Sequence, residues 1–222
     1  MAILKGSSAD PILLIAPYRD NCPVSEDDPP RLGNAAFLLE LGRVLSTHPM
    51  RYSIWLIFVP EKTDSGDGRS RADSADPTPW PELTRVVSRF QQSGVLKRVR
   101  VAVFFEGMGV PDSVALRDSH SHPIYREVFW ESARDLELTD VFPPDAVFAS
   151  SESGHHALIQ EGLRRTVLVS ATPASGISEP PAAGDARARA EALQSVGDVS
   201  LEAILRIQTR LERIDGLSGP PE

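Results

Sequence analysis

The residues best suited to chemistry are a carboxylate and two glycines that follow an apolar stretch in the middle of the chain. Residues 99–105 are apolar at almost every position, and they continue into Glu106, Gly107, Met108 and Gly109. Such a run predicts a strand that is buried on both faces. In open α/β sheets, ligands bind beyond the carboxyl ends of the strands. Glu106 is therefore a candidate acid or base, and a solvated glutamate at a strand end is the alternative.

A second carboxylate and a lysine follow the predicted buried strand at residues 52–59. These are Glu61 and Lys62. Neighbouring parallel strands end at the same edge of a sheet, so we expect both side chains to lie near Glu106. One interpretation is a structural salt bridge between Lys62 and Glu106. The other is a cleft in which two carboxylates and a lysine have shifted pKa values and transfer protons.

Four histidines could take part in the same site. His155 and His156 begin a short predicted helix, and neighbours on a helix diverge by roughly 100°, so we expect one of them, His155, to point into the cleft. His120 and His122 form a His-x-His pair in a predicted loop, where extended backbone would place both on one side. With Glu106 this pair could ligate a metal, although no third ligand is close in sequence.

Polar residues also follow the first predicted strand. Tyr18, Arg19 and Asp20 are candidates for substrate binding, together with His120, His122 and His156. Cys22 comes next in the chain and could be a nucleophile beside a histidine, but a single cysteine before a proline is more often incidental. No Gly-x-Ser-x-Gly segment and no phosphate-binding glycine loop occurs in the chain.

The elements that position these residues alternate between strand and helix. Buried strands are predicted at residues 11–16, 52–59, 99–105, 146–149 and 166–170, and helices at 34–46, 82–92, 123–136, 154–162, 186–193 and 200–214. Pro17 is expected to end the first strand, and residues 110–122 are expected to form a loop. This order predicts a single three-layer α/β domain over residues 1–222, with a mostly parallel central sheet and helices on both faces. Residues 63–79 are expected to form a mobile loop and residues 216–222 a frayed tail.

The composition narrows the choice of partners. The formal net charge is −8 and the pI is about 5.2, which argues against binding nucleic acid through a basic surface. No apolar run has the length of a membrane helix, and one cysteine excludes an internal disulfide bond, as is typical of a cytoplasmic protein. The expected partner is a small molecule or a peptide-like ligand.

Taken in order, the landmarks resemble those of the M28 family of zinc aminopeptidases and the related glutaminyl cyclases. The segments that carry the resemblance are residues 15–19 (IAPYR), 34–44 (NAAFLLELGRV), 58–62 (FVPEK), 105–109 (FEGMG), 153–155 (SGH), 176–180 (GISEP) and 199–210. The resemblance implies a zinc-exopeptidase-like fold. In that family, five protein ligands hold one or two zinc ions.

Several of the family's ligand positions have changed in this chain. Pro17 stands at the first histidine, Lys62 at the second glutamate of a pair and Ser178 at the final histidine. The bridging aspartate corresponds to about Pro30, with Asp27 and Asp28 a few residues away. Among the matched ligand positions, only Glu106 could still ligate. The resemblance therefore implies that the zinc site is lost, and we expect no metal or other cofactor.

Three hypotheses follow from these changes. The first is a metal-independent enzyme that uses Glu106 and Glu61 as an acid–base pair, with Lys62 and His155 as electrostatic partners. In the resemblance, Glu61 matches the family's general base. The second is a non-catalytic relative that binds a ligand or a partner protein. The third is a zinc hydrolase with shifted ligands such as Asp20, Asp28, Glu106 and His155.

Overall fold

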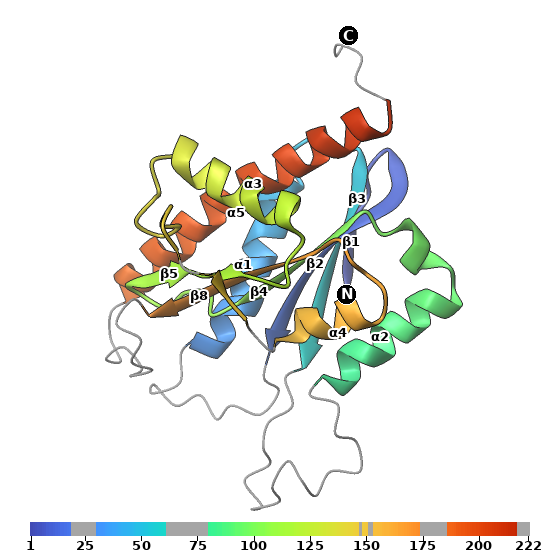
Figure 1. The fold of residues 1–222 in the computed structure, drawn as a ribbon, viewed down its shortest axis with the longest axis horizontal. Coiled ribbons are helices and arrows are strands. Elements are labelled where there is room, and N and C mark those ends of the chain that lie inside the picture. The colour runs from blue at the N-terminus through green and yellow to red at the C-terminus, as the bar shows by residue number, and fades with distance from the viewer. Residues whose placement is uncertain (19–29, 61–79, 147, 151–152, 174–185, 217–222) are drawn as a thin grey trace, which may run out of the picture.

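A six-stranded mixed sheet forms the centre of the structure, a computed structural model that describes residues 1–18, 30–60, 80–146, 148–150, 153–173 and 186–216. The strands lie in the order β1 (Ala2–Leu4), β3 (Tyr52–Pro60), β2 (Ser8–Tyr18), β4 (Val101–Glu106), β8 (Thr166–Pro173) and β5 (Ser113–Ala115). The four inner strands are parallel, and the two edge strands are antiparallel to their neighbours (Figure 1). Beyond β5 in the chain, β6 (Arg117–Asp118) and β7 (Phe148–Ala149) form a separate parallel pair.

Helices cover both faces of this sheet (Figure 1). One face packs against α1 (Pro30–Leu45), α3 (Pro123–Asp135) and α5 (Ala186–Ile214), and the other against α2 (Pro81–Gln92) and α4 (Gly154–Gln160). A 3-10 turn, η2 (Val95–Arg98), joins α2 to β4. Side chains of the inner strands alternate between two apolar clusters, with Ile12 and Leu14 on the α5 face and Leu13 and Ile15 on the α2 face. The predicted three-layer α/β fold is confirmed.

Two predictions about the strands are wrong. Strand β2 continues through Pro17, which pairs with Val59 of β3, whereas the pairing of β2 with β4 ends at Ile15. At Pro17, β2 pairs with β3 but no longer with β4. A proline, which has no N–H to donate to a second neighbouring strand, is therefore tolerated there. The expected loop at residues 110–122 contains the strands β5 and β6. They were not predicted because strands of three and two residues are too short to show a periodic pattern.

The last two predicted helices are in fact one helix, α5, of 29 residues. Gly197 does not interrupt it, because a buried stripe that includes Val196, Val199 and Ala203 continues past the glycine. At the far end of α5, the Tyr52 hydroxyl donates to Asp215 at 2.7 Å, which holds the end of the helix against the amino edge of the sheet. No helix in the described ranges is both long and apolar enough to cross a membrane.

The chain reverses its direction of winding between β2 and β4. From β2 it passes over one face through α1 to β3, and from β3 it returns over the other face through α2 to β4. In doubly wound sheets, the crevice beyond the carboxyl ends of two such strands is where ligands bind. Tyr18 ends β2 and Glu106 ends β4, so both lie at this switch point.

The loop that follows Glu106 is held from two sides. Gly107 has a φ of +70°, and a Cβ there would overlap the carbonyl oxygen of Ala171 in β8. On the other side, a Cβ at Gly33 of α1 would overlap the Met108 carbonyl oxygen, and the Met108 N–H donates to Asn34 Oδ1 at 2.9 Å. Close backbone packing therefore fixes the carboxyl end of β4.

We predict that Gly107→Ala destabilises the protein by about 2–5 kcal/mol, because it adds overlap with Ala171 to the strain of a positive φ. Gly94→Ala is the matched control, since Gly94 has a φ of +74° and a Cβ added there would have no atom within 4 Å. It should cost only about 1–2 kcal/mol. Urea unfolding measures both values, and equal costs would show that the approach to Ala171 is unimportant.

Candidate functional site

Glu106 lies at the carboxyl end of β4, where its Cα pairs with that of Ser170 in β8. Ala102 and Phe104 belong to the apolar cluster on the α2 face, and strand alternation places Glu106 on that face as well. Pro17 and Ser170 share this face by the same alternation from Ile15 and Leu168. The carboxyl edge on the α2 face therefore presents a partly buried carboxylate between a proline and a serine.

Several predicted site residues lie outside the described residues. These are Arg19, Asp20, Cys22, Glu61 and Lys62, together with the predicted mobile loop at residues 63–79. In the sequence, Glu61 and Lys62 directly follow Pro60, the last residue of β3, whose Cα pairs with that of Tyr18. Their predicted proximity to Glu106 stays a prediction.

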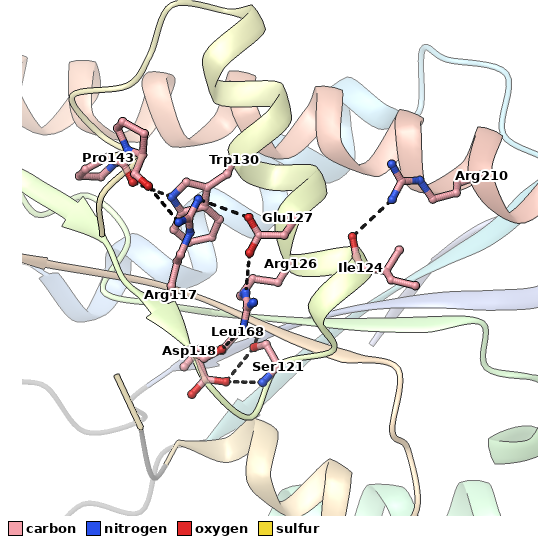
Figure 2. Close-up of polar contacts among 11 residues, drawn as sticks. Arg117, Asp118, Ser121, Ile124, Arg126, Glu127, Trp130, Pro143, Leu168 and Arg210 are labelled. Carbon is pink, nitrogen blue, oxygen red and sulfur yellow. Dashed lines mark hydrogen bonds and ion pairs between the residues drawn. The ribbon is translucent and has the colours of Figure 1, made fainter. Parts of the chain in front are cut away.

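His155 lies in a buried polar network. Its side chain is 0% exposed, its Nε2 is 3.0 Å from Asp118 Oδ2, and its Nδ1 is 2.9 Å from the Ser153 hydroxyl. The same Asp118 oxygen accepts from the N–H and the hydroxyl of Ser121, at 2.6 and 2.8 Å. Ser121 Oγ in turn accepts the Leu168 N–H at 2.8 Å, so the network joins β6, α4 and β8 (Figure 2 shows the bonds of Asp118, Ser121 and Leu168).

These contacts place His155 in the interior of the fold, where it joins neighbouring segments, and its predicted role at the site stays a prediction. In the tautomer with its proton on Nε2, this nitrogen donates to the Asp118 carboxylate and Nδ1 accepts from Ser153. Ser153, His155 and Asp118 thus have the connectivity of a nucleophilic triad. However, Ser153 is only 5% exposed, and its oxygen also accepts the His155 N–H at the start of α4. The serine therefore caps the helix.

Sequence reasoning missed Asp118, which the whole network surrounds. Burial by itself raises the pKa of the Asp118 carboxyl, but hydrogen bonds from His155 and Ser121 outweigh it and lower the pKa to about 2. Arg126 also donates to the Asp118 carbonyl oxygen at 2.8 Å (Figure 2). The aspartate lies in a two-residue strand, so no pattern in the sequence could have identified it as buried.

The arginines around β6 tie this strand to α3. Glu127 lies between them, 3.0 Å from Arg126 Nε and 3.3 Å from Arg117 (Figure 2). The Arg117 guanidinium also lies 4.9 Å from the centre of the Trp130 ring and donates to the Pro144 carbonyl oxygen at 2.9 Å. These contacts support the backbone that carries Asp118, and they explain how the two-residue strand β6 is held in position.

The other histidines are arranged differently from the prediction. His120 and His122 do not converge: the rings of His120 and His156 lie 4.1 Å apart between centres, whereas His122 packs on Tyr125 at 4.8 Å. His120 Nε2 is also 2.7 Å from the Ser150 hydroxyl. Burial lowers the pKa of His122, and nearby Arg165 lowers it further. The structure thus separates the predicted His-x-His pair and brings His120 together with His156, which was predicted to bind substrate.

The side chains at the resembling positions do not fit a zinc ion. Pro17 and Pro30 have no donor atom, and the sequence has Lys62 and Ser178 at two further positions. Zinc sites need three or four His, Cys, Asp or Glu ligands. Within the described ranges, no group of three or more such residues could hold a metal. His155, a ligand in the shifted-zinc hypothesis, has both ring nitrogens engaged in the buried network.

Comparison with solved structures defines the class of this fold as that of the zinc exopeptidases. A zinc-dependent exopeptidase from Parabacteroides distasonis matches with a TM-score of 0.67 and 17% identity, over 91% of this chain and 74% of that chain. Within the class, glutaminyl cyclases match as well. The enzyme from an Acidobacteriales bacterium has a TM-score of 0.69 and 22% identity over 94% of this chain and 72% of that chain.

A glutaminyl cyclase from Bacteroides thetaiotaomicron, bound to N-acetylhistamine, has a TM-score of 0.68 and 16% identity, over 91% of this chain and 75% of that chain. No protein-family model and no curated protein matches the sequence. At these identities the similarity shows a shared M28-peptidase-like fold, as the sequence landmarks indicated.

We predict that Asp118→Asn destabilises the protein at pH 7 and that the difference from wild type narrows in acid. The folded-state pKa of Asp118 is about 2, below the ordinary value near 4, so its ionisation stabilises the fold above about pH 4. This contribution, about 2 kcal/mol, is lost as the pH falls toward 2. Urea unfolding at pH 7, 5 and 2.5 should give the same difference at pH 7 and 5 and a smaller one at pH 2.5.

The control for this prediction is Asp140→Asn, at an exposed aspartate after α3. Its effect should be small at all three pH values, because exposed substitutions rarely change stability by more than about 0.5 kcal/mol. A pH-independent difference between wild type and Asp118→Asn would contradict the assignment of a paired, ionised Asp118.

Proposed function

We propose that this protein is a metal-independent enzyme on the zinc-exopeptidase fold, acting on a small molecule or a peptide-like intermediate with Glu106 as its acid or base. The observation that carries the proposal is the place of Glu106, a carboxylate at the switch point between β2 and β4. Ligands bind at such points in this class of sheet. Close packing of the loop after Glu106, at Gly107 and Met108, holds the carboxyl end of β4 in one position.

The chemistry available at this site is proton transfer. A carboxyl group can protonate a leaving group when it is neutral and can accept a proton when it is ionised. Glu61 and Lys62, next in the chain after β3, are the proposed partners of Glu106. A lysine near the two carboxylates would favour their ionised forms. The effect is larger on the nearer carboxylate, which would then act as the base.

The first test is metal content. We predict that the protein purified from zinc-supplemented cells holds no stoichiometric zinc, because prolines occupy positions where the resembling family has ligands. Elemental analysis after dialysis without chelator measures this. One or more tightly held zinc ions per chain would overturn the proposal and restore the zinc-hydrolase hypothesis with ligands other than His155.

The second test concerns Glu106. Peptides with N-terminal glutamine or leucine are sensible first substrates, since the structural neighbours include glutaminyl cyclases and a leucine aminopeptidase precursor. In protein treated with a metal chelator, we predict that Glu106→Gln lowers any turnover by about 10²–10⁴-fold without changing the urea midpoint of unfolding. The reason is that glutamine fills the same space as glutamate but cannot gain or lose a proton. Mass spectrometry detects loss of ammonia or release of leucine.

The matched control is Glu212→Gln, in the last turns of α5 near the opposite edge of the sheet. It should leave both turnover and stability unchanged. Normal turnover in a stable Glu106→Gln protein would remove Glu106 from the mechanism. Loss of both turnover and stability would mark Glu106 as part of a structural ion pair.

A second candidate function is non-catalytic ligand binding by the same edge of the sheet. The burial of His155 favours it, because one of the four ionisable groups proposed for catalysis lies in the interior of the fold. The two candidates differ in one measurement. A peptide that raises the melting temperature of the wild type but is recovered unchanged after long incubation supports binding without catalysis.

A further inference from the structure

A cavity of about 480 Å³ lies between α1 and α5, on the face of the sheet opposite to Glu106. The two helices lie side by side on that face (Figure 1). The cavity is lined by five larger apolar side chains, Phe37, Leu41, Val44, Leu193 and Leu201. Its volume is within the range of small-molecule pockets, and its lining has their mainly apolar character.

Gly197, in the α5 wall of this cavity, is not required by packing. A Cβ at Gly197 would meet only Phe37, at 3.9 Å, which is ordinary contact. In contrast, a Cβ at Gly42 would overlap the Leu56 side chain, so that glycine is needed for packing. Glycine inside a helix costs about 1 kcal/mol relative to alanine. The chain therefore keeps a destabilising residue whose effect is to leave the cavity open.

The charged groups that line the cavity are acidic, and the remaining polar lining residue is the neutral Gln194. Glu40 and Asp198 both line it, and the Glu40 carboxylate is already bonded to Arg43, at 2.6 and 2.8 Å. Asp198 is exposed, and no hydrogen bond or ion pair joins its side chain to another residue in the described ranges. An apolar cavity with an available carboxylate at its mouth matches a ligand with an aliphatic chain and a cationic head.

We infer that the cavity between α1 and α5 is a binding site for a small alkylammonium compound, with the chain among Phe37, Leu41 and Leu193 and the ammonium beside Asp198. A protein partner fits less well, because a stable protein interface buries about 800 Å² on each side and this cavity is confined between two helices. The site is independent of the proposed function at Glu106. Leu193 nevertheless lies close to the loop after Glu106, since a Cβ added at Gly109 would be 3.2 Å from it.

The test uses three probes of equal length: hexylammonium, hexanol and hexanoate. Calorimetric titration of the full-length protein should give the tightest binding for hexylammonium, about two- to fivefold tighter than hexanol, which is the range for one exposed ion pair. Hexanoate should bind more weakly than hexanol. Equal affinity for all three, or no binding of any, would overturn the proposal.

Two substitutions at Gly197 separate filling of the cavity from stability. Gly197→Leu should abolish hexylammonium binding and raise the melting temperature by about 2–4 °C, because leucine fills the cavity and favours the helix. Gly197→Ala should raise the melting temperature but keep binding. Retained binding in a folded Gly197→Leu protein would place the ligand elsewhere and refute the site.

Asp198→Asn tests the charge. It should remove the preference for hexylammonium over hexanol while hexanol affinity stays unchanged. Glu191→Gln is the control, at an exposed carboxylate that lies on the same helix outside the cavity lining and is paired with Arg187. If Glu191→Gln reduces the preference as much as Asp198→Asn, the attraction comes from the acidic surface in general, and the proposed role of Asp198 is wrong.

Discussion

Close backbone packing at the carboxyl end of β4 is the constraint on which the candidate site depends. Three segments that are distant in sequence meet there: the start of α1, the loop after Glu106 and the end of β8. Only glycine permits this approach at positions 33 and 107, since any Cβ would overlap a carbonyl oxygen. The helix that leaves β2 thus holds the loop that leaves β4. This contact therefore fixes the carboxyl end of β4, one of the two strands at the switch point.

A second constraint lies on the other side of β8, where one carboxylate organises the chain. Asp118 accepts from Ser121 and His155, and so connects β6 to α4. A buried charge is stable only when hydrogen bonds replace its lost water. The network meets this demand with local donors, and the low pKa of Asp118 reflects it. The close backbone packing at Gly107 and the Asp118 network therefore both hold β8, the neighbour of the strand that ends in Glu106.

The sequence was informative where a pattern extends over several residues. The buried strands β3 and β4 follow from continuous apolar runs and helix α2 from apolar periodicity, and the resemblance of ordered landmarks predicted the fold. The candidate Glu106 followed from its place after a buried strand. The buried contacts of His155 could not be predicted, because its partner Asp118 is 37 residues away in a strand of two. The same limit applies to Gly107 and Gly33, whose roles depend on contacts between distant segments.

The proposed loss of the zinc site has an electrostatic consequence for the fold. A site that binds a divalent cation gathers several carboxylates, and these repel one another when the ion is absent. Here prolines stand at two of those positions and Glu106 is the carboxylate that remains among the matched ligands. A single partly buried carboxylate needs no divalent ion to be stable. Its protonation can then follow its own surroundings, as an acid–base role requires, whereas a zinc ligand must stay ionised.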